Sequence, residues 1–286
     1  MENIRERIVS CAGRVWFCAK ELLKWLALAM ITGVPCGIIG AAFDLAVEHV
    51  TELRTEHTAI LFLLPVIGLV IVALYKAAKL EGVSTDDMID CVKDGKPIRF
   101  WLLPVMFIST VLTHLGGGSA GREGAALQMG GTIGWWAGGV LHLNEHERRM
   151  AVQCGMAAFF SALFSTPLAA TFFAMTIVNV GVVFYAAYIP CFAAALIAYG
   201  ISLLIGVSPT RFAVDVPAFE PAMAVRVVLL ALACAVVVHL FCFVLHSAAH
   251  GLPKLLPNPW VRAFLGGCVV VLFTLLYGDM RYNGAG

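Results

Sequence analysis

The sequence predicts an all-α, polytopic membrane protein, on the evidence of its composition and the distribution of its charged residues. Hydrophobic residues fill 60% of the 286 positions, the mean hydropathy is +0.89 and 13% of the residues are charged, whereas a soluble domain carries about 25% charged residues. About 20 helical residues cross roughly 30 Å of hydrocarbon. The segments that are long enough and contain no Asp, Glu, Lys or Arg are 25–43, 57–75, 100–121, 124–144, 150–210 and 227–253.

Basic residues precede the first apolar segment and set the expected orientation. Arg5, Arg7, Arg14, Lys20 and Lys24 have the spacing of an amphipathic helix over residues 4–20 that lies on the membrane. The loop 51–57 contains one arginine, and the loop 76–99 contains five basic residues. Because cytoplasmic loops are enriched in lysine and arginine, this alternation predicts a cytoplasmic N-terminus.

The elements that follow are also expected to be helices. Two spans at 22–51 and 59–79 precede a short helix at 86–94. Asn144 is expected to cap one of the later helices. Proline and glycine interrupt many apolar stretches, so we expect kinked and re-entrant helices rather than a simple bundle. The later helices are expected at 98–115, 123–141, 145–164, 166–180, 184–205, 222–249 and 261–277.

Cysteine and histidine residues do not indicate a metal site or a cofactor. The nine cysteines show no C-x-x-C spacing and lie mostly within apolar segments, which is typical of reduced packing residues. His142 and His146 are four residues apart, but the charged residues beside them indicate a solvated loop. We expect no metal, no cofactor and no nucleic-acid partner.

The segment THLGGGSAGREGAALQMGG, residues 113–131, places a charged pair within a run of glycines between apolar stretches. GGGSAG cannot stay helical, and non-helical backbone at membrane depth is tolerated only where it is buried in protein or lines a watery cavity. We therefore expect residues 116–121 to face a pathway. A glycine-rich break before a helix leaves unpaired N–H groups and a partly positive helix end, both of which attract anions.

Glu123 is expected at the mouth of that site as a tethered anion. When it is ionised, it competes for the positive helix end, and when it is protonated it can leave. Its proton and the bound anion are thereby linked. Ionisable groups inside a membrane cost about 2.5–3.5 kcal/mol and mark function by default. The alternative is a structural ion pair between Arg122 and Glu123 or another partner, with glycines that allow close helix packing.

The motif GREG at a helix start, preceded by Gly-Ser-Ala, resembles the chloride channel (CLC) family of anion channels and anion/proton antiporters. GREGAALQMGG, the downstream FSALFSTPLAATFFA and the order of long and short helices extend the resemblance over nearly the whole chain. It implies that Glu123 is the gating glutamate. It also implies a first anion-contacting loop at EGVSTDDMID. The implied anion-binding residues are Gly121, Arg122, Gly124, Ala125, Ser84 and Thr85.

The same resemblance implies an inverted repeat of two membrane halves, of which mainly the first is present. The expected division is an N-terminal helix at 1–21, a first repeat at 22–210 and an incomplete second repeat at 211–286. The implied protein is a homodimer in the inner membrane of a prokaryote, in contact with lipid, that moves chloride or fluoride with or without protons. Because the family continues beyond the point where this chain stops, at MRYNGAG, we expect an incomplete reading frame or a fragment.

The sequence departs from the family pattern at three places. Ala125 stands where a proline usually follows GREG, and GVSTD replaces the usual first loop. Asp86 and Asp87 are expected to cap the short helix rather than face an anion. Where many antiporters of the family carry an internal proton-accepting glutamate, this chain has Thr176 and Ile177. These departures favour a channel or the fluoride-exporting branch.

Two other functions fit parts of the sequence. GGSAG matches the G-x-S-x-G pattern of serine hydrolases, with Ser119 as the nucleophile and His114 nearby. That nucleophile elbow needs a strand before the turn, whereas 100–115 is an apolar stretch of helical length. A secondary transporter of another class, such as an amino-acid carrier, also agrees with the composition. The favoured interpretation is anion transport without covalent chemistry.

Overall fold

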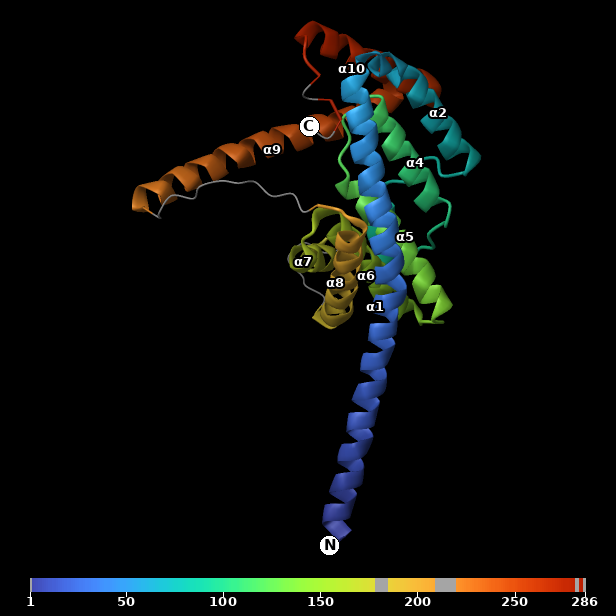
Figure 1. Ribbon diagram of the computed structural model, residues 1–286, viewed down its shortest axis with the longest axis vertical. Helices are drawn as coiled ribbons and strands as arrows, with labels where there is room; N and C mark the ends of the chain where they lie inside the picture. Colours follow the sequence, from blue (N-terminus) through green and yellow to red (C-terminus); the bar gives the residue numbers. More distant parts are fainter. Residues whose placement is uncertain (1, 178–184, 209–219, 281–282, 285–286) are drawn as a thin grey trace.

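The structure is a computed structural model that describes residues 2–177, 185–208, 220–280 and 283–284, and their side chains except at 2–13, 15, 17, 18 and 222. Every regular element in these ranges is a helix, as predicted (Figure 1). The elements are α1 (Glu2–Glu56), η1 (Thr58–Leu63), α2 (Leu64–Ala77), α3 (Thr85–Asp94), α4 (Leu102–Leu115), α5 (Glu123–Val140), α6 (Glu145–Phe164), α7 (Pro167–Thr176), η2 (Tyr185–Ala187), α8 (Tyr188–Ile205), α9 (Pro221–Leu255) and α10 (Pro259–Tyr277).

Several helical segments have the length and apolar character needed to cross a membrane. Within the described ranges there are five of them, Ala19–Glu56, Thr58–Ala77, Tyr185–Ile205, Met223–Leu255 and Pro259–Tyr277. α4 and α7 are apolar but shorter. This mixture of long and short apolar helices agrees with the predicted polytopic membrane fold.

The first helix is longer than predicted. α1 runs from Glu2 to Glu56 without a break, so the helix expected at 4–20 is present but is part of the same helix as the first span (Figure 1). The residues that join the two parts, AKELLK at 19–24, are strong helix formers and include neither glycine nor proline. Pro35 lies inside α1 and does not end it.

The core lies where α1, α5, α6 and α8 pack against one another. α5 and α6 make the most extensive contact, and glycines form it. A Cβ on Gly134 would fall against the carbonyl oxygen of Ala151, and one on Gly155 would fall against the carbonyl oxygen of Gly130. The two helices therefore meet backbone to backbone. α6 in this way fixes the position of α5.

The start of α6 carries the predicted cap. The Glu147 N–H donates to Asn144 Oδ1 over 2.9 Å, and the Asn144 N–H donates to Glu147 Oε2 over 3.3 Å. This reciprocal pair satisfies two N–H groups that an uncapped helix would leave unpaired. Glu147 also pairs with Lys24 of α1. The cap and the ion pair together tie the start of α6 to the long first helix.

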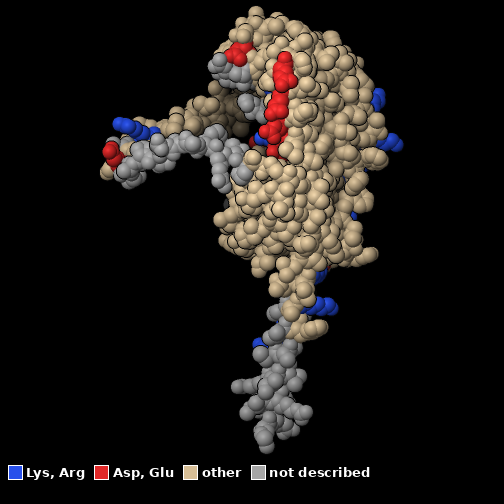
Figure 2. Space-filling model, viewed as in Figure 1, with Lys and Arg blue, Asp and Glu red and all other residues tan. Residues whose placement is uncertain are grey.

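Acidic side chains form a row along the C-terminal half of α1 (Figure 2). Asp44, Glu48 and Glu52 follow one another at four-residue intervals, which places them on one face of the helix. Glu48 and Glu52 are exposed, and Asp44 is partly buried. The row therefore runs from the end of α1 towards the helix packing around α5.

The last two long helices differ in their packing. α9 projects away from the other helices (Figure 1), and its apolar side chains are exposed along its length. α10 packs against α2, where a Cβ on Gly267 would fall 2.6 Å from the Cα of Pro65. α10 is thus attached to the first half of the chain through α2.

Candidate functional site

The glycine-rich loop separates α4 from α5, as predicted from GGGSAG. α4 ends at Leu115, α5 begins at Glu123, and Gly117 adopts φ +77°, which favours glycine. Gly116, Gly117 and Gly118 are buried, and Ser119 is exposed and lines a cavity of about 490 Å³. The loop is thus partly buried in protein and partly open to a cavity. Both are conditions under which non-helical backbone is tolerated at membrane depth.

Glu123 is the first residue of α5, and its carboxylate folds back over the loop. A Cβ on Gly121 would collide with Glu123 Oε2, so the absence of a side chain there leaves room for the carboxylate. Arg122 is the N-cap residue of α5, and its carbonyl oxygen accepts a hydrogen bond from the Ala126 N–H over 2.9 Å. The N–H groups before Ala126 therefore lie at the partly positive end of α5. Glu123 itself is exposed.

Arg122 pairs with an acid that the sequence reading did not single out. Its Nη1 lies 2.5 Å from Asp44 Oδ1 of α1, and its guanidinium lies 6.0 Å from the centre of the Phe164 ring. Arg122 and Glu123 are thus not an ion pair with each other in the described part of the chain, because Arg122 binds Asp44 of α1. Asp44 directly follows the first charge-free segment, 25–43. An acid at that depth was the signal that could have revealed it.

The two hydroxyl residues of the first loop have different surroundings. Ser84 precedes α3, and both its N–H and its hydroxyl donate to Asp87 Oδ2, over 2.7 and 3.2 Å. The predicted capping by Asp87 is therefore confirmed. Thr85 Oγ1 accepts a hydrogen bond from Gln128 Nε2 over 3.2 Å and lies 3.2 Å from where a Cβ on Gly124 would stand. The Thr85 hydroxyl thus lies at the first turns of α5, and Ser84 points to its own helix.

The structure brings together most of the residues predicted for the site. Glu123, Gly124 and Ala125 form the start of α5, Gly121 lies in the loop directly before it, and Thr85 lies beside Gly124. Ala125 is 5% exposed, so its methyl group packs into the core. The two residues that turn elsewhere are Ser84, which binds Asp87, and Arg122, which binds Asp44.

The segment before the loop does not have the conformation that a serine hydrolase needs. α4 is a helix up to Leu115, whereas the nucleophile elbow follows a strand. His114 is buried, and its Nδ1 lies 2.8 Å from Thr110 O of the same helix. The ring is therefore bound to the backbone of α4.

Comparison with known proteins gives matches along most of the chain. Residues 67–286 match the sequence model of a family described as voltage gated chloride channel. The chain is 30% identical over 266 residues to a chloride/fluoride channel protein of Pseudomonas syringae pv. tomato, covering 91% of this chain and 58% of that protein. It is 34% identical over 171 residues to the H⁺/Cl⁻ exchange transporter ClcA of Cronobacter sakazakii, covering 54% of this chain and 36% of that protein. The chain thus spans less than two thirds of the length of these relatives.

Two solved structures share the fold. A CLC-type fluoride/proton antiporter superposes with a TM-score of 0.86 and 28% identity, over 92% of this chain and 68% of its own. A slow cyanobacterial Cl⁻/H⁺ antiporter superposes with a TM-score of 0.74 and 20% identity, over 87% of this chain and 63% of its own. The second similarity concerns the fold alone.

Proposed function

We propose that this chain, which belongs to the voltage-gated chloride channel family, carries a small monovalent anion across a membrane past the start of α5. The observation that carries the proposal is the Glu123 carboxylate, which folds over Gly121 at the positive end of α5. A carboxylate in that place occupies the position that a permeating anion would need. The gate is therefore the side chain of Glu123.

Protonation and anion binding are coupled in this arrangement. An ionised Glu123 competes with the permeating anion for the N–H groups at the start of α5. A protonated Glu123 has lost the charge that holds it there and leaves the site to the anion. Each event then favours the other, which is the linkage that a pH-dependent gate or a proton-coupled exchanger requires. Thr85, beside Gly124, supplies a hydroxyl donor to the same site.

We infer that fluoride is the transported anion, because the two matches above 25% identity that cover most of the chain both name fluoride, the first together with chloride. The matches to a chloride/fluoride channel protein and to a fluoride/proton antiporter cover 91% and 92% of this chain, and the match to the H⁺/Cl⁻ exchange transporter covers 54%. Thr176 donates its hydroxyl to Phe172 O over 2.8 Å and cannot serve as a proton acceptor of the glutamate type. The proposal places the protein as a homodimer in a prokaryotic inner membrane, with a cytoplasmic N-terminus and a separate pathway in each subunit.

Flux from proteoliposomes tests this function. Fluoride, chloride and nitrate efflux would be measured at several external pH values for the wild type, Glu123→Gln and Glu123→Asp. Glu123→Gln is expected to keep or raise the flux and to lose its pH dependence, because the competing charge is gone. Glu123→Asp keeps the charge on a shorter side chain, and its flux should be impaired. Glu220→Gln, an exposed position before α9, is the matched control. A wild-type pH profile in Glu123→Gln contradicts the proposal.

A further inference from the structure

Two glycine-containing loops meet on a buried arginine at the end of α1. Arg54 lies in the last turn of α1 and is 4% exposed. Gly117 and Gly284 adopt φ +77° and +78°, and Cβ atoms on them would lie 3.2 Å from Arg54 Nη1 and 3.0 Å from Nη2. Both glycines therefore leave the space that the guanidinium fills. Gly117 belongs to the same loop as Gly121, beneath the Glu123 carboxylate.

The hydrogen bonds of this arginine satisfy only part of its guanidinium. Nη2 donates to Asn283 O over 3.3 Å, and Asn283 Nδ2 in turn donates to Gly117 O over 3.1 Å. Nε and Nη1 have no hydrogen-bond partner among the described residues, and none of the ion pairs in those ranges includes Arg54. A buried charge is costly unless it is paired and hydrogen-bonded. Arg54 thus has two donors and a full charge without a partner among the described residues, and both donors are covered by protein, so a ligand from the cavity reaches them when the lining side chains move aside.

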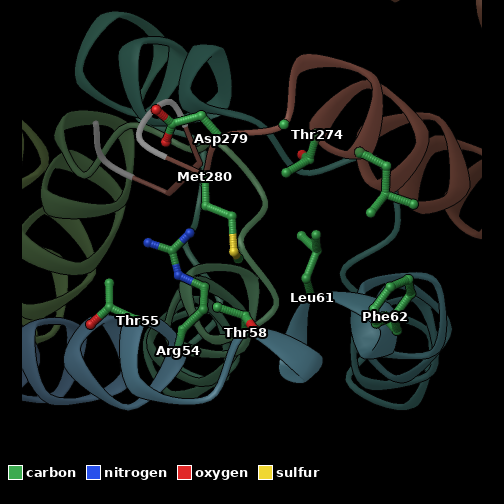
Figure 3. Close-up of a pocket in the computed structure, with 10 residues that line it drawn as sticks. Arg54, Thr55, Thr58, Leu61, Phe62, Thr274, Asp279 and Met280 are labelled. Carbon is green, nitrogen blue, oxygen red and sulfur yellow. The ribbon is translucent and has the colours of Figure 1, made fainter.

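Arg54 lines a cavity of about 610 Å³ between the end of α1 and the end of α10. Figure 3 shows the guanidinium extending from α1 into this cavity, with Thr58 and Leu61 along one side. The hydroxyls of Thr55 and Thr274 donate to carbonyl oxygens of their own helices. The Arg54 N–H groups, with the hydroxyl of Thr58, are therefore the donors on this wall.

One group in the cavity opposes an anion. Asp279 enters the lining from the opposite wall, after α10, and Figure 3 places Met280 between the two charged side chains. An anion bound on the Arg54 side is thus attracted by the guanidinium at contact distance and repelled by Asp279 from farther away. Because the Coulomb energy falls with distance, attraction by Arg54 wins at that side of the cavity.

We propose that Nε and Nη1 of Arg54 bind a halide ion in this cavity, at a site separate from the one guarded by Glu123. The identity of the halide as the transported ion and the site guarded by Glu123 rest on the proposed function, whereas the Arg54 site does not. The two sites lie at opposite ends of one loop, 116–121. The positive charge of Arg54 attracts anions to this end of the loop, which favours capture by the second site.

Bromide in crystals of the wild-type protein is the direct probe. We expect an anomalous peak within hydrogen-bond distance of Arg54 Nε or Nη1, in addition to any peak at the start of α5. A peak near Glu123 alone would overturn the Arg54 site and leave the proposed function intact. No peak at Arg54 overturns the inference whatever the Glu123 region shows, and this measurement needs no variant to fold.

Affinity and flux separate a binding site from a purely structural arginine. Calorimetric titration of bromide into Arg54→Gln should show affinity at one site lowered by roughly ten- to hundredfold, the effect of losing hydrogen bonds from a charged group. The half-saturating halide concentration for flux should rise with an unchanged pH profile. Arg262→Gln is the matched control, because Arg262 donates to Leu256 O outside this cavity. Unchanged bromide binding in Arg54→Gln, or an altered pH profile with full binding, would mean that Arg54 only clamps the two loops.

Discussion

Replacement of Asp44 by asparagine tests whether α1 influences the gate proposed at Glu123. Asp44 Oδ1 lies 2.5 Å from Arg122 Nη1, and the two side chains are 16% and 28% exposed. A hydrogen bond to a charged group contributes roughly 1.5–3 kcal/mol, and partial exposure to solvent reduces the expected loss of stability to about 1–2 kcal/mol. Asp44→Asn also leaves the positive charge of Arg122 uncompensated. That charge then stabilises the ionised carboxylate of the neighbouring Glu123.

The expected functional result is a shift of the pH profile. Asp44→Asn removes the acid that binds Arg122, so the guanidinium is left free to hold the neighbouring carboxylate in place, and the midpoint of flux should move to a lower pH. The assay is anion flux against external pH, combined with thermal unfolding in detergent. Glu48→Gln removes the same charge one turn along α1, at an exposed position, and serves as the control. Equal shifts in the two variants, or an unchanged midpoint in Asp44→Asn, would refute the role given to the ion pair.

Three further predictions follow from the packing around the site. Gly134→Ala should lower the free energy of unfolding by about 1–3 kcal/mol, because α6 leaves no room for a methyl group. Gly266→Ala should leave it unchanged, because no atom lies within 4 Å of the added Cβ. Thr85→Ala should weaken halide affinity by up to about tenfold through the loss of one hydrogen bond. Ser84→Ala should destabilise α3 by about 1 kcal/mol and leave the halide affinity unchanged. Calorimetric titration of halide distinguishes the two variants. Burial raises the pKa of the Cys91 thiol to about 12, so maleimide labelling of a variant with Cys91 as its sole cysteine should stay slow up to about pH 10 and accelerate only on unfolding.

Local sequence features predicted the elements that depend on local chemistry. Charge-free segments predict the helical membrane fold, GGGSAG predicts the break before α5, and Asn144 predicts the start of α6. Each of these features depends on neighbours within a few residues. The family resemblance carried by GREG is confirmed by the match over residues 67–286. The motif also predicted that Glu123 stands at the start of a helix, which the structure shows.

Contacts between distant residues could not be predicted from the sequence alone. Arg122 had several acids available, and only the path of α1 past α5 selects Asp44. Ser84 and Thr85 are adjacent and chemically similar, and the direction of α3 decides which hydroxyl lies beside Gly124. The sequence does not single out Arg54, because the two glycines beside it, Gly117 and Gly284, come from distant parts of the chain. Tertiary packing decides each of these outcomes.

The backbone contact between α5 and α6 restricts how the proposed pathway would open. Cβ atoms on Gly130, Gly134 and Gly155 would lie within 2.4 Å of carbonyl oxygens of the facing helix, so the two backbones are in close contact and packing holds α5 in place. The helix therefore keeps its position, and the side chain of Glu123 is the part that can rotate. Rotation of an exposed side chain is far faster than the movement of a packed helix. Opening would then depend on the arrival of a proton or an anion. The Glu123 side chain would rotate while the surrounding helices keep their positions.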